Sequence, residues 1–140
     1  MKILEVLTKE RITGNIGERL AEKYLKNAGY KVLKRNYVAE NNEIDLIVKN
    51  KDTVIFVEVK SRNVGTTDTY LSRPAEAVNQ KKQQGIIKAA SYFLSCNYEY
   101  RGYRVRFDVV EVYLSGRKSE KIKHLINTFD RDTAYRRSYK

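Results

Sequence analysis

Asp45, Glu58 and Lys60 are the residues whose types and spacing most clearly suggest chemistry in this sequence. Two carboxylates that face each other across a strand pair have Cβ atoms about 4.5–5.5 Å apart and repel unless a cation lies between them. A hard divalent cation could bind there through Asp45, Glu58 and a backbone carbonyl such as that of Val59. Such an ion would activate a water and stabilise charge on a phosphoryl group, and Lys60 could orient that water or help to deprotonate it.

A short hairpin is expected to bring Asp45 and Glu58 together. The segments 43–49 and 53–61 are rich in β-branched and apolar residues, which predicts two strands. A two-residue loop at 51–52 pairs positions whose numbers sum to 103, so that Asp45 lies opposite Glu58. Ile44 and Leu46 then share the other, wholly apolar face of the hairpin. A three-residue loop with a bulge would shift this pairing.

The same residues also have a simpler interpretation as a surface cluster of ion pairs. Lys60 would then pair with Glu43 and Glu58 across and along the strands, at little gain in stability. A Glu-x-Lys pattern is common by chance. The opposed Asp45, the apolar flanks and the basic chain together favour the metal site.

The charge of the whole chain indicates a polyanionic partner. The 140 residues include 28 Lys and Arg against 17 Asp and Glu, a net charge of +11. This favours nucleic acid first and an acidic membrane surface second, with a merely solubilising surface as the alternative. The longest apolar run is far shorter than the roughly 20 residues of a membrane span. We therefore expect a cytoplasmic protein that is not embedded in a membrane.

The single cysteine and the single histidine restrict the metal chemistry. With only Cys96 and His124, the chain forms neither an internal disulfide nor a thiolate zinc site. Any metal must be held by oxygen, which points to Mg²⁺ or Mn²⁺. Cys96 is expected to be a small core residue at the end of an apolar helix.

The hydrophobic pattern predicts an α/β domain with a mixed sheet flanked by helices, in the order helix, three strands, helix, one or two strands. The expected elements are a helix over 16–28 that Asn15 caps and Gly29 ends, strands over 30–38, 43–49 and 53–61, a helix over 79–96, a strand over 104–114 and an edge strand over 120–126. The strand–helix–strand step should be a parallel crossover. We divide the chain into an arm or short helix (1–12), one domain (13–129) and a basic, loosely held tail (130–140).

Several motifs together resemble a known family. They are Gly14, Gly17-Glu18, Ala21, Leu25, Asn36-Tyr37, Glu43-Ile44-Asp45-Leu46-Ile47, Phe56-Val57-Glu58-Val59-Lys60 with Arg62, Ala77-Val78, Lys82-Gln83, Ala90 and Arg106-Phe107-Asp108-Val109-Val110. Over about residues 13–129 the chain resembles the PD-(D/E)xK nuclease superfamily, and within it the YraN-like uncharacterised protein family, UPF family 0102.

The resemblance implies a restriction-endonuclease-like core, close to archaeal Holliday-junction resolvases, and magnesium-dependent phosphodiester cleavage. It implies that Asp45 and Glu58 ligate the metal, that Lys60 serves the water and that Glu18 completes the site as an accessory acid. From spacing alone, Glu18 equally suits a capping box with Asn15. Asn42 stands where such proteins often have glycine.

Basic and polar residues outside the core motif are candidate contacts to nucleic acid. Lys82 and Gln83 begin the second helix, and a solvated helix face is the alternative for both. Arg62 follows the Glu-x-Lys motif, and the polar segment 61–73 is a candidate substrate loop or a plain connection.

A second group of candidates lies near the C-terminal half. Tyrosines and arginines, including Arg101 and Arg104, alternate over 98–106 as they do in stacking surfaces, but ordinary strand alternation explains the pattern equally well. Asp108 is expected to point inward and pair with an arginine. The tail would strengthen phosphate binding without specificity through Arg131, Arg136, Arg137 and Lys140.

Two functions remain from the sequence. The first is a metal-dependent nuclease that acts on DNA in preference to RNA, including branched DNA. The second is a nucleic-acid-binding module that reuses the nuclease fold without cleavage. A membrane-surface or protein-interaction domain is a weaker third, because no amphipathic basic helix supports it. The sequence leaves open whether the protein forms a homodimer.

Overall fold

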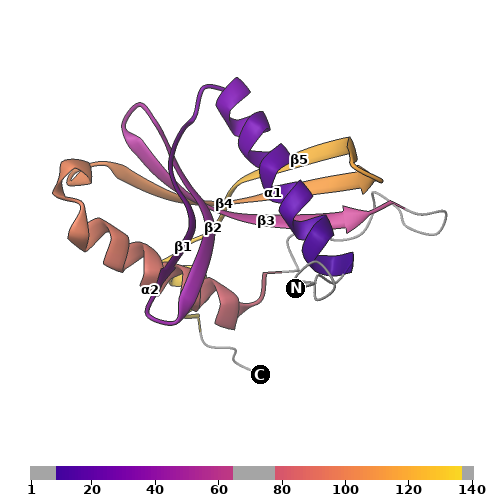
Figure 1. Ribbon diagram of the computed structural model, residues 1–140. Coiled ribbons are helices and arrows are strands. Elements are labelled where there is room, and N and C mark those ends of the chain that lie inside the picture. The colour runs from indigo at the N-terminus through magenta and orange to yellow at the C-terminus, as the bar shows by residue number, and fades with distance from the viewer. Residues whose placement is uncertain (1–8, 65–77, 137–140) are drawn as a thin grey trace, which may run out of the picture.

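The computed structural model describes the backbone of residues 9–64 and 78–136, and within these ranges the side chains from residue 15 onward. The elements are α1 (Lys9–Asn27), β1 (Lys31–Ala39), β2 (Asn42–Asn50), β3 (Thr53–Asn63), α2 (Gln80–Cys96), a 3-10 turn (Tyr98–Tyr100), β4 (Arg104–Ser115), β5 (Lys118–Phe129) and α3 (Arg131–Ala134). This confirms the predicted α/β class and the predicted order of elements (Figure 1).

The five strands form one mixed sheet in the order β1-β2-β3-β4-β5. Neighbouring strands are antiparallel except β3 and β4, which run parallel and are joined through α2. A parallel pair needs such a crossover, because the chain must return to the starting edge of the sheet. The crossover that the sequence predicts is therefore present.

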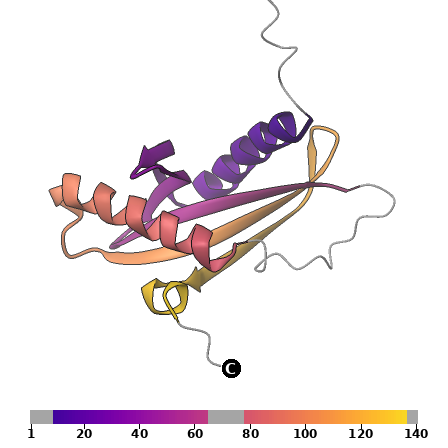
Figure 2. The same cartoon turned by 90° about the horizontal axis from the view of Figure 1, so that it is seen from below.

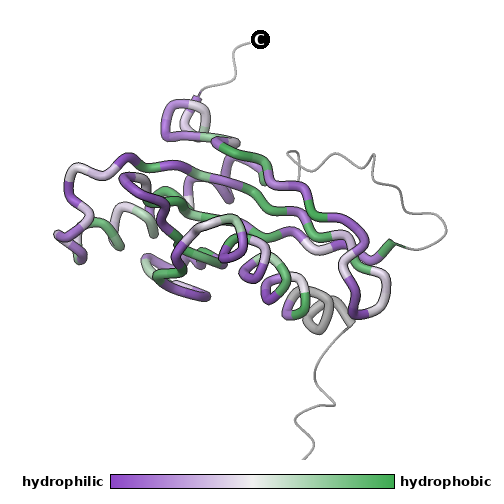
Figure 3. Tube along the Cα trace, turned by 90° about the horizontal axis from the view of Figure 1, so that it is seen from above, coloured by the Kyte–Doolittle hydropathy of each residue, from purple (hydrophilic) through white to green (hydrophobic). Residues whose placement is uncertain are grey.

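The two long helices cover opposite faces of the sheet (Figure 2). One apolar cluster lies under α2 and includes Phe56 and Phe93, and the other lies under α1 and includes Leu25 and Val57. Figure 3 shows the hydrophobic stretches running along the central strands, with polar residues on the outer sides of the helices. Because both faces are covered, β2, β3 and β4 have long runs of buried residues rather than a strict alternation.

Helix α1 begins earlier than the sequence predicts. It starts at Lys9, so part of the expected arm 1–12 is helical and Asn15 lies inside the helix instead of capping it. The predicted capping box between Asn15 and Glu18 is therefore wrong. Gly29 follows the helix as expected, and its φ of +98° is a conformation that suits glycine.

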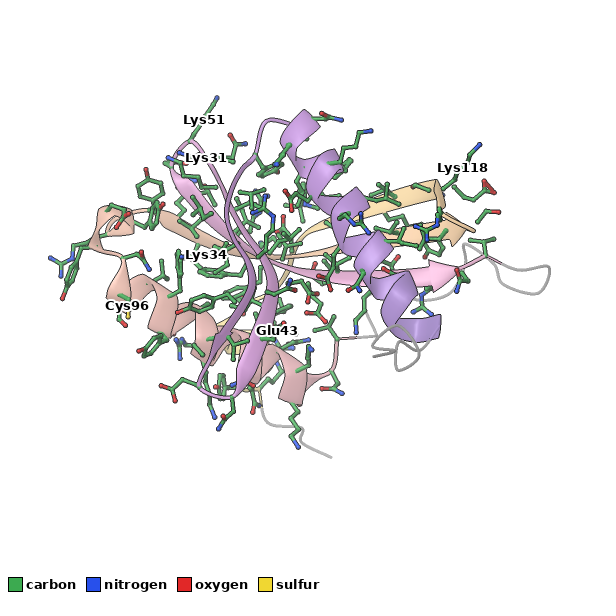
Figure 4. The ribbon with its side chains drawn as sticks, viewed as in Figure 1. Lys31, Lys34, Glu43, Lys51, Cys96 and Lys118 are labelled. Atoms are coloured by element: carbon green, nitrogen blue, oxygen red, sulfur yellow. The ribbon has the colours of Figure 1, made fainter. Side chains whose placement is uncertain are left out.

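Three expectations for the C-terminal half need correction. Cys96 is exposed at the C-terminal end of α2 rather than part of the core (Figure 4). The edge strand β5 is longer than expected, from Lys118 to Phe129. Residues 130–136 are not loosely held: Asp130 caps α3 through a capping box with Thr133, and Ala134 is fully buried.

Some predictions concern residues outside the described ranges. These are the arm up to residue 8, most of the candidate loop 61–73, and Arg137 and Lys140 of the tail. In the part of the chain that is described, none of the helices has the length and apolar character needed to cross a membrane.

Candidate metal and nucleic-acid site

The hairpin of β2 and β3 has the register that the sequence predicts. Its pairs run from Asn50 opposite Thr53 to Leu46 opposite Val57, so the paired numbers sum to 103. The turn has two residues, and Lys51 adopts a φ of +54° to close it. Counted from the turn, the last backbone pair is Leu46 with Val57, so Asp45 and Glu58 are the first positions beyond the paired ladder.

The strands separate at Asp45, where the side chain, and not the backbone, contacts β3. Its Oδ2 atom accepts a hydrogen bond from the backbone N–H of Val59 at 2.7 Å. This N–H thus donates to a side chain of β2 and not to a backbone carbonyl of that strand. Ile44 packs in the cluster under α2, whereas Leu46 packs under α1. The prediction that Ile44 and Leu46 share one face is therefore wrong, because the alternation of β2 is interrupted at Asp45. This interruption turns the carboxylate toward β3.

Asp45 and Glu58 form an electrostatically unfavourable pair. Burial and the negative charge of Glu58 raise the pKa of Asp45 from 3.8 to about 8, although the Val59 N–H partly opposes the rise. Without a cation, Asp45 therefore resists ionisation near neutral pH.

Glu58 is 4% exposed, and only one of its two carboxylate oxygens has cationic neighbours. Its Oε2 atom lies 3.6 Å from Nζ of Lys60 and 3.5 Å from Nζ of Lys82. Its Oε1 atom is buried without a hydrogen-bond partner. A buried carboxylate oxygen without a partner is costly, which makes this atom a candidate cation ligand.

Helix α1 brings a third carboxylate, that of Glu18, to the same place. The helix can approach β3 closely because residue 17 is glycine: a Cβ atom there would overlap the Ser61 hydroxyl. The pKa of Glu18 is raised by its partial burial and by the charges of Glu43 and Glu58. The Glu18 side chain therefore lies within the electrostatic influence of Glu43 and Glu58. It does not cap α1, which begins at Lys9.

The donor set fits a hard divalent cation. Asp45, Glu58 and Glu18 offer only carboxylate oxygens, the ligands that Mg²⁺ and Mn²⁺ prefer, and the Oε1 atom of Glu58 is buried without a hydrogen-bond partner. As they are placed, however, no three acidic, histidine or cysteine side chains of residues 15–64 and 78–136 lie so that they could hold a metal ion together. Glu58 instead faces the two lysines in this state.

Three of the predicted nucleic-acid contacts lie on the elements next to Glu58, at the start of α2 and toward the end of β3. Lys82 contacts Glu58 from the first turn of α2. Gln83 donates to the carbonyl of Val78 at 2.8 Å, while its own Oε1 atom is buried without a partner. Arg62 follows Lys60 on the same face of β3, and its Nε atom is also buried and unpaired.

Arg101 and Arg104 lie elsewhere. The backbone N–H of Arg104 donates to the carbonyl of Asp52 in the β2–β3 turn, six residues before Glu58 and roughly 20 Å from it along the strand. Arg101 stacks on the exposed ring of Tyr98. Tyr100 and Tyr103, in contrast, pack against the core, so the interleaved tyrosines serve mainly the fold.

A pocket of about 280 Å³ opens beside Asp45 between α1 and the first two strands. Asn15, Arg19 and Asn36 line it together with Glu18 and Asp45. Asn36 has a φ of +48°, at the position of β1 opposite Asp45 in register. Apart from the resemblance at Asn36, no feature of the sequence indicates this pocket.

Asp108 and His124 form a separate buried cluster on the face under α1. The carboxylate of Asp108 accepts two hydrogen bonds from Arg106, at 2.9 and 2.8 Å, and contacts Nε2 of His124 at 2.7 Å. The backbone N–H of Asn127 also donates to it. Asp108 therefore points inward and pairs with an arginine, as the sequence predicts.

The comparison with protein families decides the family. The model of the uncharacterised protein family UPF0102 matches residues 17–112, more than half of the chain. The chain belongs to this family.

Members of UPF0102 match nearly their full length. The UPF0102 protein of Caldanaerobacter subterraneus subsp. tengcongensis is 39% identical over 122 residues, which cover 86% of this chain and 96% of the relative. The one of Alkaliphilus oremlandii is 46% identical over 117 residues, which cover 83% and 96%. Among solved structures, Pyrococcus furiosus SfsA in complex with Ca²⁺ is similar, at 17% identity and a TM-score of 0.34, over 82% of this chain and 62% of that one. A TM-score this low supports no inference.

The part of the chain that matches UPF0102, residues 17–112, contains the whole acidic cluster of Glu18, Asp45 and Glu58. It also contains Glu111, a fully buried carboxylate of β4 that the sequence analysis missed. The signal for Glu111 was weak. If only one face of the sheet is assumed to be buried, a single acidic residue in an apolar strand is expected to point to solvent.

Proposed function

We propose that this protein is a metal-dependent nuclease that hydrolyses phosphodiester bonds in nucleic acid, in DNA in preference to RNA, with Mg²⁺ or Mn²⁺. One observation carries the proposal: Glu58 is buried with its Oε1 atom unpartnered, and its charge, together with burial, raises the pKa of the neighbouring Asp45. The α/β core and the Asp, Glu-x-Lys pattern are consistent with a restriction-endonuclease-like fold of the PD-(D/E)xK type.

Each side chain has a role that its position supports. Asp45 and Glu58 would hold the cation, with Glu18 on the α1 side as an accessory ligand. The bound ion would supply an activated water and neutralise charge on the phosphoryl group. Lys60, on the strand face of Glu58, would orient the attacking water or the phosphate oxygen.

The basic residues around the site would hold the substrate. Lys82 is half exposed and lies at the start of α2, where it can reach a phosphate that approaches Glu58. The net charge of +11 favours a polyanion at long range. Partly buried carboxylates need this help, because they repel a phosphate backbone when no cation is bound.

A second function, nucleic-acid binding without cleavage, is favoured by the ion pairs of Glu58. Lys60 and Lys82 both lie within 4 Å of its carboxylate, so the acidic cluster is partly neutralised without metal. If these pairs persist in the functional state, the cluster is a structural element under a basic surface.

Cleavage of labelled duplex, single-stranded and four-way-junction DNA, each with Mg²⁺, Mn²⁺ or EDTA, separates the two functions. We expect metal-dependent cleavage by the wild type and none by Asp45→Asn/Glu58→Gln. Glu99→Gln, which changes an exposed carboxylate on the 3-10 turn, is the matched control. The RNA equivalents of the same substrates test the preference for DNA.

The nuclease proposal fails if the purified protein cuts none of these substrates and calorimetry detects no binding of Mn²⁺. Salt-dependent binding of DNA under those conditions would instead support the binding module. Cleavage that persists in the double variant would show a contaminating nuclease or a different site.

A further inference from the structure

Glu111 of β4 is fully buried, and its carboxylate is only half satisfied. The hydroxyl of Tyr113 donates to Oε1 at 2.9 Å, whereas Oε2 is buried without a hydrogen-bond partner. Leaving a carboxylate oxygen unpaired away from water is costly, so such an atom usually has a cationic partner in some state of the protein.

The register of the sheet puts two lysines next to Glu111. Lys60 is its partner on the parallel strand β3, and Lys123 is its partner on β5. Directly paired residues have Cβ atoms about 5 Å apart on one face, so a lysine side chain reaches the neighbouring carboxylate. The ammonium of Lys123 lies over the ring of Tyr113, at 5.6 Å from its centre. Lys60 instead points toward Glu58.

Lys60 must leave Glu58 if a cation binds there. Its ammonium is 3.6 Å from Oε2 of Glu58, a position from which it would repel a divalent cation on the same carboxylate. Lys82, with 47% of its side chain exposed, can withdraw into solvent. Lys60 is 29% exposed and extends from the middle of the sheet, so it needs another anion nearby.

We propose that Glu111 is a positioning residue that receives the ammonium of Lys60 when a divalent cation occupies Glu58. Lys60 thus moves between two carboxylates on neighbouring strands, one the proposed metal ligand and the other the unpaired oxygen of Glu111. The shift removes a competing charge from the cation and keeps the lysine at the site. This inference rests on the proposed metal site.

Calorimetric titration of Mn²⁺ into four proteins tests this exchange: the wild type, Glu111→Gln, Lys60→Met and Lys60→Met/Glu111→Gln. The glutamine can still accept the Tyr113 hydrogen bond, so the fold should be kept, and circular dichroism checks this. We expect Glu111→Gln to weaken Mn²⁺ binding about five- to tenfold, since Lys60 then stays on Glu58. With Lys60 replaced, the second substitution should change the affinity less than about twofold. Glu120→Gln, an exposed carboxylate on β5, is the matched control.

Each outcome decides between the proposals. If Glu111→Gln weakens binding equally with and without Lys60, Glu111 has only a structural role and the inference is wrong. If Glu111→Gln leaves the affinity of the wild-type background unchanged, the inference is wrong although the metal site stands. If the wild type binds no Mn²⁺, the proposed function and this inference fail together.

Discussion

Asp45→Asn should stabilise the metal-free protein at alkaline pH while it abolishes cation binding. Asparagine reproduces the protonated form of Asp45: its carbonyl oxygen can accept from the backbone N–H of Val59, and its amide can donate to Glu58. The substitution therefore keeps the contacts of the neutral carboxyl group and removes the charge that the folded protein disfavours.

The magnitude follows from the pKa of Asp45. The pKa is raised in the folded protein from 3.8 to about 8, by burial first and by Glu58 second. The folded state then binds more protons than the unfolded state between these values, so wild-type stability falls as pH rises from about 4 to about 8. One pKa unit is worth about 1.36 kcal/mol, which sets an upper limit of about 6 kcal/mol. Because relaxation and water penetration lower the real cost of a buried charge, we expect a gain of about 2–4 kcal/mol at pH 9.

Urea unfolding in EDTA at pH 5, 6.5, 8 and 9 measures this difference. We expect the two proteins to be close in stability at pH 5 and to diverge as pH rises. Asp52→Asn is the matched control, because Asp52 is 74% exposed in the β2–β3 turn and should change stability by less than about 0.5 kcal/mol throughout. Parallel stability curves for wild type and Asp45→Asn would refute the claim that Asp45 resists ionisation.

Addition of Mg²⁺ to the same series connects the stability to the proposed site. A cation that binds only the folded wild type stabilises it by about 2.7 kcal/mol at a concentration of 100 times the Kd. Magnesium should therefore close most of the gap at pH 8 and leave Asp45→Asn unchanged. Equal effects on both proteins would place the cation elsewhere.

Three further predictions concern residues around the site. Gly17→Ala should cost about 1–3 kcal/mol in urea unfolding because the new Cβ overlaps the Ser61 side chain, and Ser61→Gly in the same protein should restore most of it. Asp108→Asn should cost about 3–5 kcal/mol at pH 7, since Arg106 loses a buried partner. Burial acts to raise the pKa of Asp108, but hydrogen bonds from His124 and Arg106 hold it below 3.8. The stability that ionised Asp108 contributes is therefore lost as pH falls through the folded pKa. In the variant, the free energy of unfolding should fall less steeply at acidic pH. Lys82→Met should tighten Mn²⁺ binding without DNA and weaken DNA binding with Mn²⁺, by calorimetry and by anisotropy; a loss in both would contradict a role as a displaceable partner of Glu58.

The hairpin was predictable because its two strands carry dense β-forming residues and a short turn, which leave few registers open. The start of α1 was not, because Thr13, Gly14 and Asn15 are poor helix formers and the helix is kept through them regardless. Cys96 was misplaced because it follows apolar residues, although the end of α2 projects away from the sheet. Local pattern thus defines an element better than its ends.

The interruption at Asp45 is also beyond the sequence pattern. Strict alternation places Ile44 and Leu46 on one face, but the separation of β2 from β3 sends them to opposite clusters. Glu111 was missed for a related reason: with a helix on each face of the sheet, both faces of β4 are buried, and an acidic residue there has no outward side to occupy.

The place where β2 and β3 separate explains why an acidic cluster can persist in this core. A continued ladder would have used the backbone N–H of Val59 for a backbone carbonyl, and the carboxylate of Asp45 would have had no donor. The separation frees that donor, brings Asp45 against Glu58, and admits Glu18 from α1 through the close approach at Gly17. The same geometry gathers three carboxylates of one charge, which the proposed cation would neutralise. A fold selected for stability alone would have no reason to keep this arrangement, because apolar residues of similar volume would remove its cost.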